Sequence, residues 1–154
     1  GSAYYHLSNF KKAVEFHTGA LEIYQQLADK TGILNVNNSI GLDHEKLGNY
    51  DKAIELFLSH LNNSPNDKSL TDTQLWLGRS YFYSESYLES KNAYLDFQIL
   101  GAVHPKYADS LYELSRVHIE LNEINEAKML LTQMLENYPD HILFNKASAL
   151  IQSL

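Results

Sequence analysis

The sequence predicts an all-α protein in which pairs of helices repeat along the chain. Residues 47–57 have the pattern of a helix end, a tight turn and a new amphipathic helix, and similar stretches recur on both sides. Anchored on one small residue each, the copies are 40, 37 and 37 residues apart, at Ala13, Ala53, Ser90 and Ala127. A period of this length is typical of stacked helical repeats. No segment alternates apolar and polar residues as a half-buried strand would.

The first part of the chain is expected to contain a short helix end and then a long helix. Residues 4–7 form the end of a helix, and Asn9 is placed to cap the next one. Apolar residues at helical spacing carry that second helix to about Asp29. Gly32 is suited to end it in the left-handed conformation.

The next pair of helices is separated by a turn at Gly48 and Asn49. A helix over residues 33–47 precedes the turn. Asp51 follows in the first turn of the next helix, where a carboxylate interacts favourably with the helix dipole. Residues 62–67 are rich in turn formers, Pro65 included, and break the pattern.

The rest of the chain continues in the same way. We expect helices over residues 70–83, 87–100, 107–121, 124–137 and 141–153. The total is about nine antiparallel helices in one continuous array. Its expected divisions are a partial repeat 1–32, repeats 33–68, 69–105 and 106–140, and a C-terminal capping helix 141–154.

Composition excludes several classes of function. The net charge of −7 argues against nucleic acid, which requires clustered Lys and Arg. The chain has no cysteine, and it lacks both a signal-peptide pattern and an apolar run of the roughly 20 residues that span a bilayer. We therefore expect a cytoplasmic protein that contacts no membrane. Gly1-Ser2 is typical of a pair left by tag cleavage, which indicates a piece of a longer protein.

The repeated stretches carry a recognisable motif. Leu77-Gly78-x-x-Tyr81 occurs in a first helix, and Ala53-x-x-x-Phe57 occurs in a second helix. The two small residues of each unit are 12 residues apart in three units, at Gly41 and Ala53, Gly78 and Ser90, and Ser115 and Ala127. On these features the chain resembles the tetratricopeptide-repeat (TPR) family. Its units of 37–40 residues exceed the 34 residues usual in that family and resemble the longer repeats of bacterial signalling proteins.

This resemblance implies a right-handed α-α solenoid whose first helices line a concave, peptide-binding groove. Helical geometry assigns a set of side chains to that inner face. The candidate binding residues are Asn38, Leu42, Leu75, Arg79, Phe82, Tyr112, Arg116 and Lys146.

Arg79 and Arg116 are the only arginines in the chain, and they occupy equivalent positions 37 residues apart. Arginine suits the bidentate capture of a carboxylate, so the expected partner is a protein or peptide with an acidic or carboxylate-bearing segment. The same side chains could instead pair with Asp72, Asp109 or Glu113 and hold adjacent helices together. The sequence leaves both interpretations open.

No pattern of catalytic or metal-ligating residues emerges. The seven histidines lack ligand spacing, and His44 and His118 occupy the family's tyrosine position, where packing explains them. We expect no cofactor, no metal and no enzyme activity. The leading hypothesis is a non-catalytic adaptor or scaffold module. The alternatives are a sensory or regulatory segment that controls an output domain outside this chain, and self-association through the first or last helix.

Overall fold

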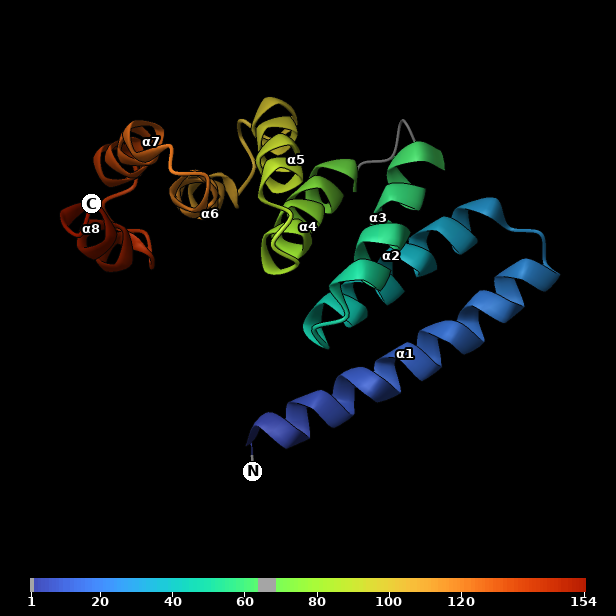
Figure 1. Ribbon diagram of the computed structural model, residues 1–154. Helices are drawn as coiled ribbons and strands as arrows, with labels where there is room; N and C mark the ends of the chain where they lie inside the picture. The colour runs from blue at the N-terminus through green and yellow to red at the C-terminus, as the bar shows by residue number, and fades with distance from the viewer. Residues whose placement is uncertain (1, 64–68) are drawn as a thin grey trace.

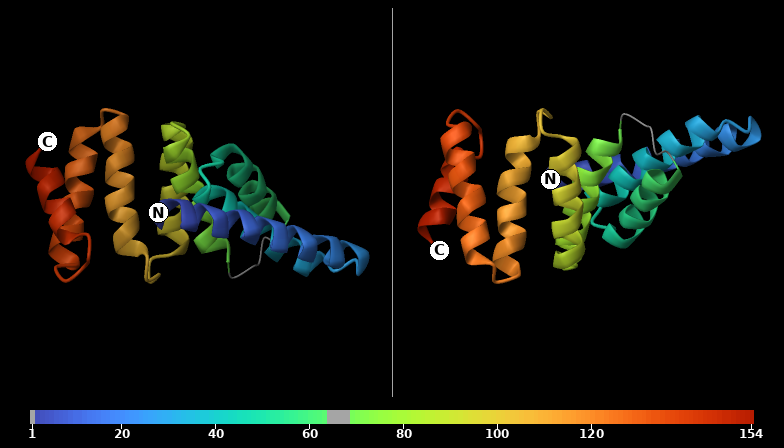
Figure 2. Two further views of the ribbon diagram at one scale, coloured as in Figure 1. Left: turned by 90° about the horizontal axis from the view of Figure 1, so that it is seen from below. Right: turned by 90° about the horizontal axis from the view of Figure 1, so that it is seen from above.

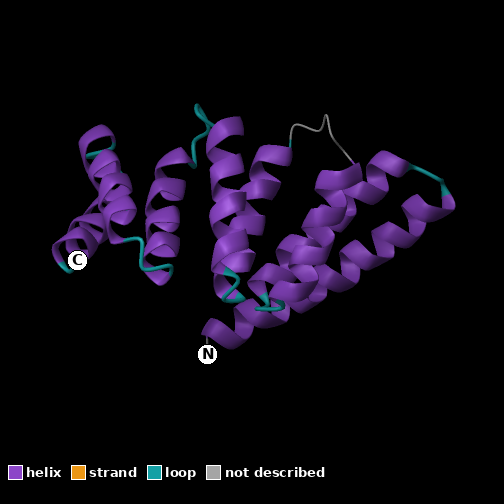
Figure 3. Ribbon diagram, turned by 45° about the horizontal axis from the view of Figure 1, so that its top comes forward, coloured by secondary structure: helices purple, strands orange, loops and turns teal. Residues whose placement is uncertain are grey.

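The computed structural model describes residues 2–63 and 69–154 of the chain, which form eight helices and no strand (Figure 3). The helices are α1 (Ser2–Gln26), α2 (Lys30–Lys46), α3 (Tyr50–Asn63), α4 (Leu70–Tyr83), α5 (Tyr87–Leu100), α6 (Tyr107–Glu120), α7 (Ile124–Asn137) and α8 (Phe144–Gln152). The all-α prediction is confirmed, and α4, α5 and α7 have the predicted bounds. The expected break at Pro65 lies outside the described residues.

The helices stack in a row from α1 at one end to α8 at the other (Figures 1 and 2). Each helix packs against the next helix in the chain, and α2 also contacts α4, which contacts α6. The first helices α2, α4 and α6 therefore form one layer of an α-α solenoid. None of the helices in the described part of the chain is long and apolar enough to cross a membrane.

Small residues set the distance between the helices of a pair. A Cβ atom added at Gly41 would lie 2.8 Å from the Phe57 ring, and one added at Gly78 would lie 3.1 Å from the Tyr94 ring. The Ser90 hydroxyl donates a hydrogen bond of 2.7 Å to the Gly78 carbonyl across the α4–α5 pair. The twelve-residue spacing in the sequence therefore corresponds to real contacts between paired helices.

The core is a series of clusters, each of which spans neighbouring pairs of helices. The buried members of the first are Ala53, Phe57, Leu77 and Ala93. Those of the second are Leu75, Tyr94, Phe97, Leu114 and Val117. Those of the third are Leu111, Leu131, Met134 and Ala147. Because each pair is completed by the next, stability depends on stacking, and Ala147 of α8 covers the last apolar face.

Two predictions about the N-terminal region were wrong. Residues 4–7 and Asn9 lie within the continuous helix α1, and the described residues form eight helices, close to the expected total of about nine. The prediction rested on the similarity between the stretch around Ser8 and the later turn between α2 and α3. That turn contains Gly48 at φ 76°, a left-handed conformation that glycine adopts without strain. The first copy has Ser8 at that position, and its backbone stays helical.

Gly32 is not a helix cap. Helix α1 ends at Gln26, and the chain turns through Ala28, whose φ is 53°. Asp29 then caps α2, because its carboxylate accepts a hydrogen bond of 3.0 Å from the Gly32 backbone N–H. Gly32 therefore lies in the first turn of α2, where an aspartate cap determines the helix start.

Candidate functional site

Two cross-helix contacts bring both arginines to the shared surface of α4 and α6. Arg79 of α4 pairs with Glu113 of α6, and one turn further along, Arg116 of α6 lies over the ring of Phe82. Equivalent positions of neighbouring repeats therefore face the same surface. We call Arg79, Phe82, Glu113 and Arg116 the arginine row.

Arg79 is engaged within the protein. Its Nη2 and Nε atoms donate to Oε1 of Glu113 at 2.6 and 3.2 Å, and the two side chains are 22% and 18% exposed. The hydroxyl of buried Tyr94 donates to Oε2 of the same carboxylate at 3.0 Å. Burial lowers the pKa of Arg79, but the charge and hydrogen bond of Glu113, together with smaller contributions from Tyr94 and Glu45, raise it, and the net pKa is raised. Arg79 therefore makes the stack-forming pair that the sequence left as one of two interpretations.

Tyr94 stays protonated as part of this network. Its burial raises the pKa of the phenol well above the ordinary value, and the negative charge of Glu113 adds to the shift. A protonated hydroxyl can donate, which satisfies the second oxygen of Glu113. The carboxylate thus accepts two hydrogen bonds from Arg79 of α4 and one from Tyr94 of α5.

Arg116 differs from Arg79 in having no carboxylate partner among the described residues. Its guanidinium carbon lies 4.4 Å from the centroid of the Phe82 ring, at the distance of a cation–π contact. That contact orients the side chain, and in the part of the chain that the structure describes the N–H groups of the guanidinium make no ion pair. Tyr83, stacked on Tyr50 with 5.4 Å between the ring centroids, is an exposed aromatic side chain in the same helix as Phe82.

The other predicted site residues are placed less favourably for binding. Leu75 is 2% exposed and belongs to the core. Asn38 is 8% exposed, and its side-chain oxygen accepts a hydrogen bond of 3.2 Å from Thr73 of α4. Leu42 and Tyr112 are partly buried against core clusters. Lys146 is exposed on α8. The face that the sequence assigned to a ligand is therefore partly used for packing.

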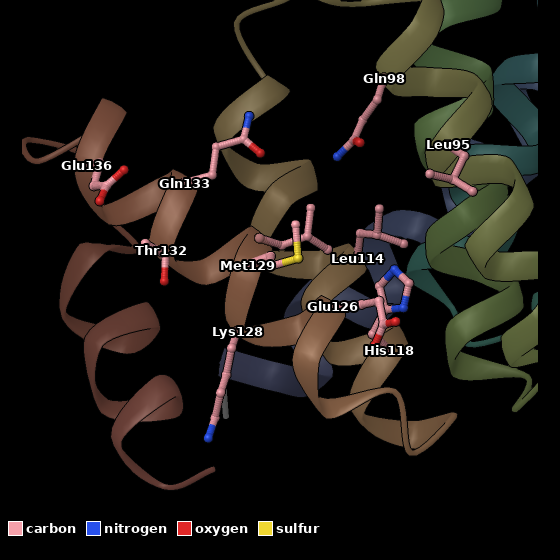
Figure 4. A pocket seen from close by; sticks show the side chains of 11 residues that line it. Leu95, Gln98, Leu114, His118, Glu126, Lys128, Met129, Thr132, Gln133 and Glu136 are labelled. Atoms are coloured by element: carbon pink, nitrogen blue, oxygen red, sulfur yellow. The ribbon is translucent and has the colours of Figure 1, made fainter.

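A groove of about 600 Å³ lies between the second helices α5 and α7, with α6 at its floor. Figure 4 shows Met129 and Leu114 at its centre, whereas Lys128 points away from them. Leu95 lines the α5 side. None of the predicted site residues lines this groove, because the sequence argument followed the first helices only. The exposed apolar side chains of Leu95 and Met129 are the signal that marks it.

The histidines make repeated contacts that the sequence analysis did not foresee. Nε2 of His104 lies 3.2 Å from Asp72, and Nε2 of His141 lies 3.5 Å from Asp109. Each Nδ1 accepts a backbone N–H from the residue two positions later. The recurrence of both His and Asp after 37 residues is the signal that could have revealed these pairs. No group of three or more His, Asp or Glu side chains suited to hold a metal occurs within residues 7–63 and 69–154.

Comparison with known proteins decides the family. Residues 1–66 and 109–141 match models of the tetratricopeptide repeat. The chain belongs to the tetratricopeptide-repeat family. TPR proteins are in general protein-interaction modules that bind proteins or peptides. A search of curated proteins gave no significant match.

Solved structures of TPR-like proteins share this fold. A kinesin light chain-like protein of P. anserina with nearly identical TPR-like repeats is 18% identical, with a TM-score of 0.80 over 97% of this chain and 79% of that chain. The apo form of the quorum sensor NprR from B. thuringiensis is 26% identical, with a TM-score of 0.72 over 90% of this chain and 41% of that chain. MamA AMB-1 is 17% identical, with a TM-score of 0.65 over 99% of this chain and 81% of that chain.

Proposed function

We propose that this TPR array is a non-catalytic adaptor or scaffold module that binds a peptide or protein segment along the α4–α6 surface, with Arg116 contacting a carboxylate of the partner. The observation that carries the proposal is the state of Arg116. It is held over Phe82 and has no ion pair among the described residues, whereas Arg79 is already neutralised by Glu113.

The chemistry of the arginine row supports a carboxylate ligand. A guanidinium group presents several N–H donors in a plane and binds a carboxylate with two parallel hydrogen bonds. Because Arg116 is positioned before the partner arrives, little side-chain freedom is lost on binding. Exposed Tyr83 offers an apolar surface for a neighbouring residue of the same peptide.

The proposal is tested with a displayed library of random peptides that end in a free carboxylate, followed by calorimetric titration of the recovered sequences. Each peptide is titrated in free-acid and amidated forms, with an internal acidic residue retained or replaced. We expect Arg116→Ala to weaken binding by about 1.5–3 kcal/mol, roughly tenfold to a hundredfold, because a charge-assisted pair is lost. Arg116→Lys should recover only part of the affinity, because Lys lacks the planar fork.

The matched control is Lys106→Ala, which removes the same charge from an exposed side chain at the start of α6. It should leave the affinity unchanged. Equal affinity of the Arg116→Ala variant and the unmodified protein would refute the role of Arg116. Undiminished affinity for the amidated peptides whose acidic residues are replaced would refute the ligand class.

A second candidate function is a sensory or regulatory segment that controls an output domain outside this chain. It is favoured by one comparison, the 26% identity to the quorum sensor NprR, of which this chain covers 41%. In that case a bound peptide would alter the spacing of α4 and α6. Hydrogen exchange of α2, α4 and α6 with and without a recovered peptide distinguishes the two. A scaffold gives protection confined to the contact surface, and a sensor gives changes that extend to helices without ligand contact.

A further inference from the structure

The two ends of the helical stack have different outer surfaces. Helix α8 exposes mostly polar side chains, as expected of a terminal cap. Helix α1 packs one side against α2 and leaves a second apolar stripe in water. Phe16 and Ile23 of this stripe are 79% and 57% exposed, and Leu27, directly after the helix, is 69% exposed. Figure 1 shows α1 along the edge of the array, with α2 on one side only. The stripe on α1 is therefore an apolar surface without a partner among the described residues.

Gly19 lies in the middle of this stripe. A Cβ atom added there would have no atom within 4 Å, in contrast to Gly41 and Gly78, which allow close contact within their own pairs. Glycine inside a helix lowers its stability relative to alanine. Packing within the chain does not account for Gly19. A glycine at the centre of an apolar stripe does permit the backbone of another helix to approach closely.

The side chains of the stripe are arranged symmetrically about the midpoint between Gly19 and Ala20. Phe16 and Ile23 are three residues from the nearer member of that pair, and Lys12 and Leu27 are seven residues from it. When two copies of such a helix cross antiparallel, each residue faces the one equally far from the midpoint on the other side. Phe16 would then meet Ile23 of the second copy, and the stem of Lys12 would cover Leu27. The depression of about 500 Å³ beside Phe16, Gly19 and Ile23 gives space for an opposing side chain.

We propose that the α1 stripe, defined as Lys12, Phe16, Gly19, Ala20, Ile23 and Leu27, packs against the same stripe of a second copy across a two-fold axis. A surface that is complementary to itself forms a closed dimer with a two-fold axis. This is the commonest symmetry of soluble oligomers. The interface contains no residue of the arginine row. Dimer formation and peptide binding can therefore be measured separately.

The first test measures mass by sedimentation equilibrium over a range of protein concentrations. The monomer has a mass of 17.6 kDa, and we expect a reversible dimer of twice that mass. Phe16→Glu should raise the dimer dissociation constant by about 100-fold or more, since each substitution acts twice in a symmetric interface. Gly19→Leu should do the same by blocking the close approach, without disturbing the monomer. Ile99→Glu, on an equally exposed residue of α5, is the matched control and should leave the dimer unchanged.

The second test reports the geometry. The chain contains no cysteine, so Ala20→Cys introduces a single thiol next to the proposed axis. Mild oxidation should give a disulfide-linked dimer, because a disulfide forms only between Cα atoms about 4.4–6.8 Å apart. Ile99→Cys is the control and should stay monomeric on a denaturing gel under the same conditions.

The remaining outcomes overturn the proposal. A monomer at all concentrations shows that the stripe does not bind a second copy. A dimer that survives Phe16→Glu and Gly19→Leu uses another surface. A species that grows beyond two subunits and is disrupted by both Phe16→Glu and Met129→Glu shows that α1 enters the α5–α7 groove of the next copy instead.

Discussion

Replacement of Glu113 by alanine should destabilise the protein more than any other single charge removal on the inner surface. Glu113 accepts hydrogen bonds from Arg79 of α4 and from Tyr94 of α5, so it joins three helices. Its loss leaves the Tyr94 hydroxyl buried without an acceptor, together with a guanidinium that is only 22% exposed.

The magnitude follows from these two losses. A buried hydroxyl without a partner costs about 1–3 kcal/mol, and a hydrogen bond to a charged group contributes about 1.5–3 kcal/mol. Water can still approach Arg79, which reduces the second figure. We expect the free energy of unfolding to fall by about 2–4 kcal/mol, a large part of the 5–15 kcal/mol typical of a domain.

Urea denaturation followed by circular dichroism measures this change in a double-mutant cycle with Arg79→Ala and Glu113→Ala. We expect a coupling energy of about 1–3 kcal/mol between the two sites. The control is Lys52→Ala, which breaks an exposed ion pair with Glu55 and should change stability by less than about 0.5 kcal/mol. A coupling energy near zero would show that the pair does not hold α4 and α6 together.

Two further predictions concern the turn after α6 and the α2–α3 contact. The pKa of Glu123 is lowered below its ordinary value of 4.5. The main cause is a hydrogen bond from Lys91; partial burial opposes this shift, and a hydrogen bond with His118 reinforces it. A lowered carboxylate pKa contributes stability above pH 4.5 that is lost as the pH falls through the folded-state value, so Glu123→Gln should destabilise at pH 7 and have less effect at acid pH in urea titrations. Equal destabilisation at both pH values would contradict this assignment. Gly41→Ala places a Cβ atom 2.8 Å from the Phe57 ring, and the crowding should outweigh the gain in helix propensity by about 1–2 kcal/mol. An unchanged thermal midpoint would mean that the ring moves aside freely.

The helices away from the N-terminus could be predicted because local signals agree there. In α4 and α7 the apolar spacing, the preceding turn residues and the small anchor residues all indicate the same bounds. The start of the chain lacked such agreement. The stretch at Ser8 resembles the later turns, but it lacks the glycine that Gly48 supplies, and helix α1 continues through it. The sequence favoured Gly32 as the end of the first long helix, but the side chain of Asp29 caps α2 and places Gly32 inside the first turn of that helix.

The candidate site could be predicted only as a surface. Repeat spacing placed Arg79 and Arg116 on one face. Which of the two arginines forms an ion pair with Glu113, however, depends on the distance between α4 and α6. That distance arises from tertiary packing. The same packing buries Leu75 and draws Asn38 into a bond with Thr73, so two residues assigned to a ligand serve the stack. The α5–α7 groove likewise depends on how far successive second helices stand apart.

The contacts between α4 and α6 have a mechanical consequence. His104, just before α6, is joined to Asp72 in the first turn of α4, and Arg79 and Phe82 of α4 meet Glu113 and Arg116 near the other end. Contacts near both ends of two parallel helices oppose splaying and sliding. The curvature of this part of the solenoid is therefore held by these contacts, and a peptide that changes the spacing of α4 and α6 has to break them.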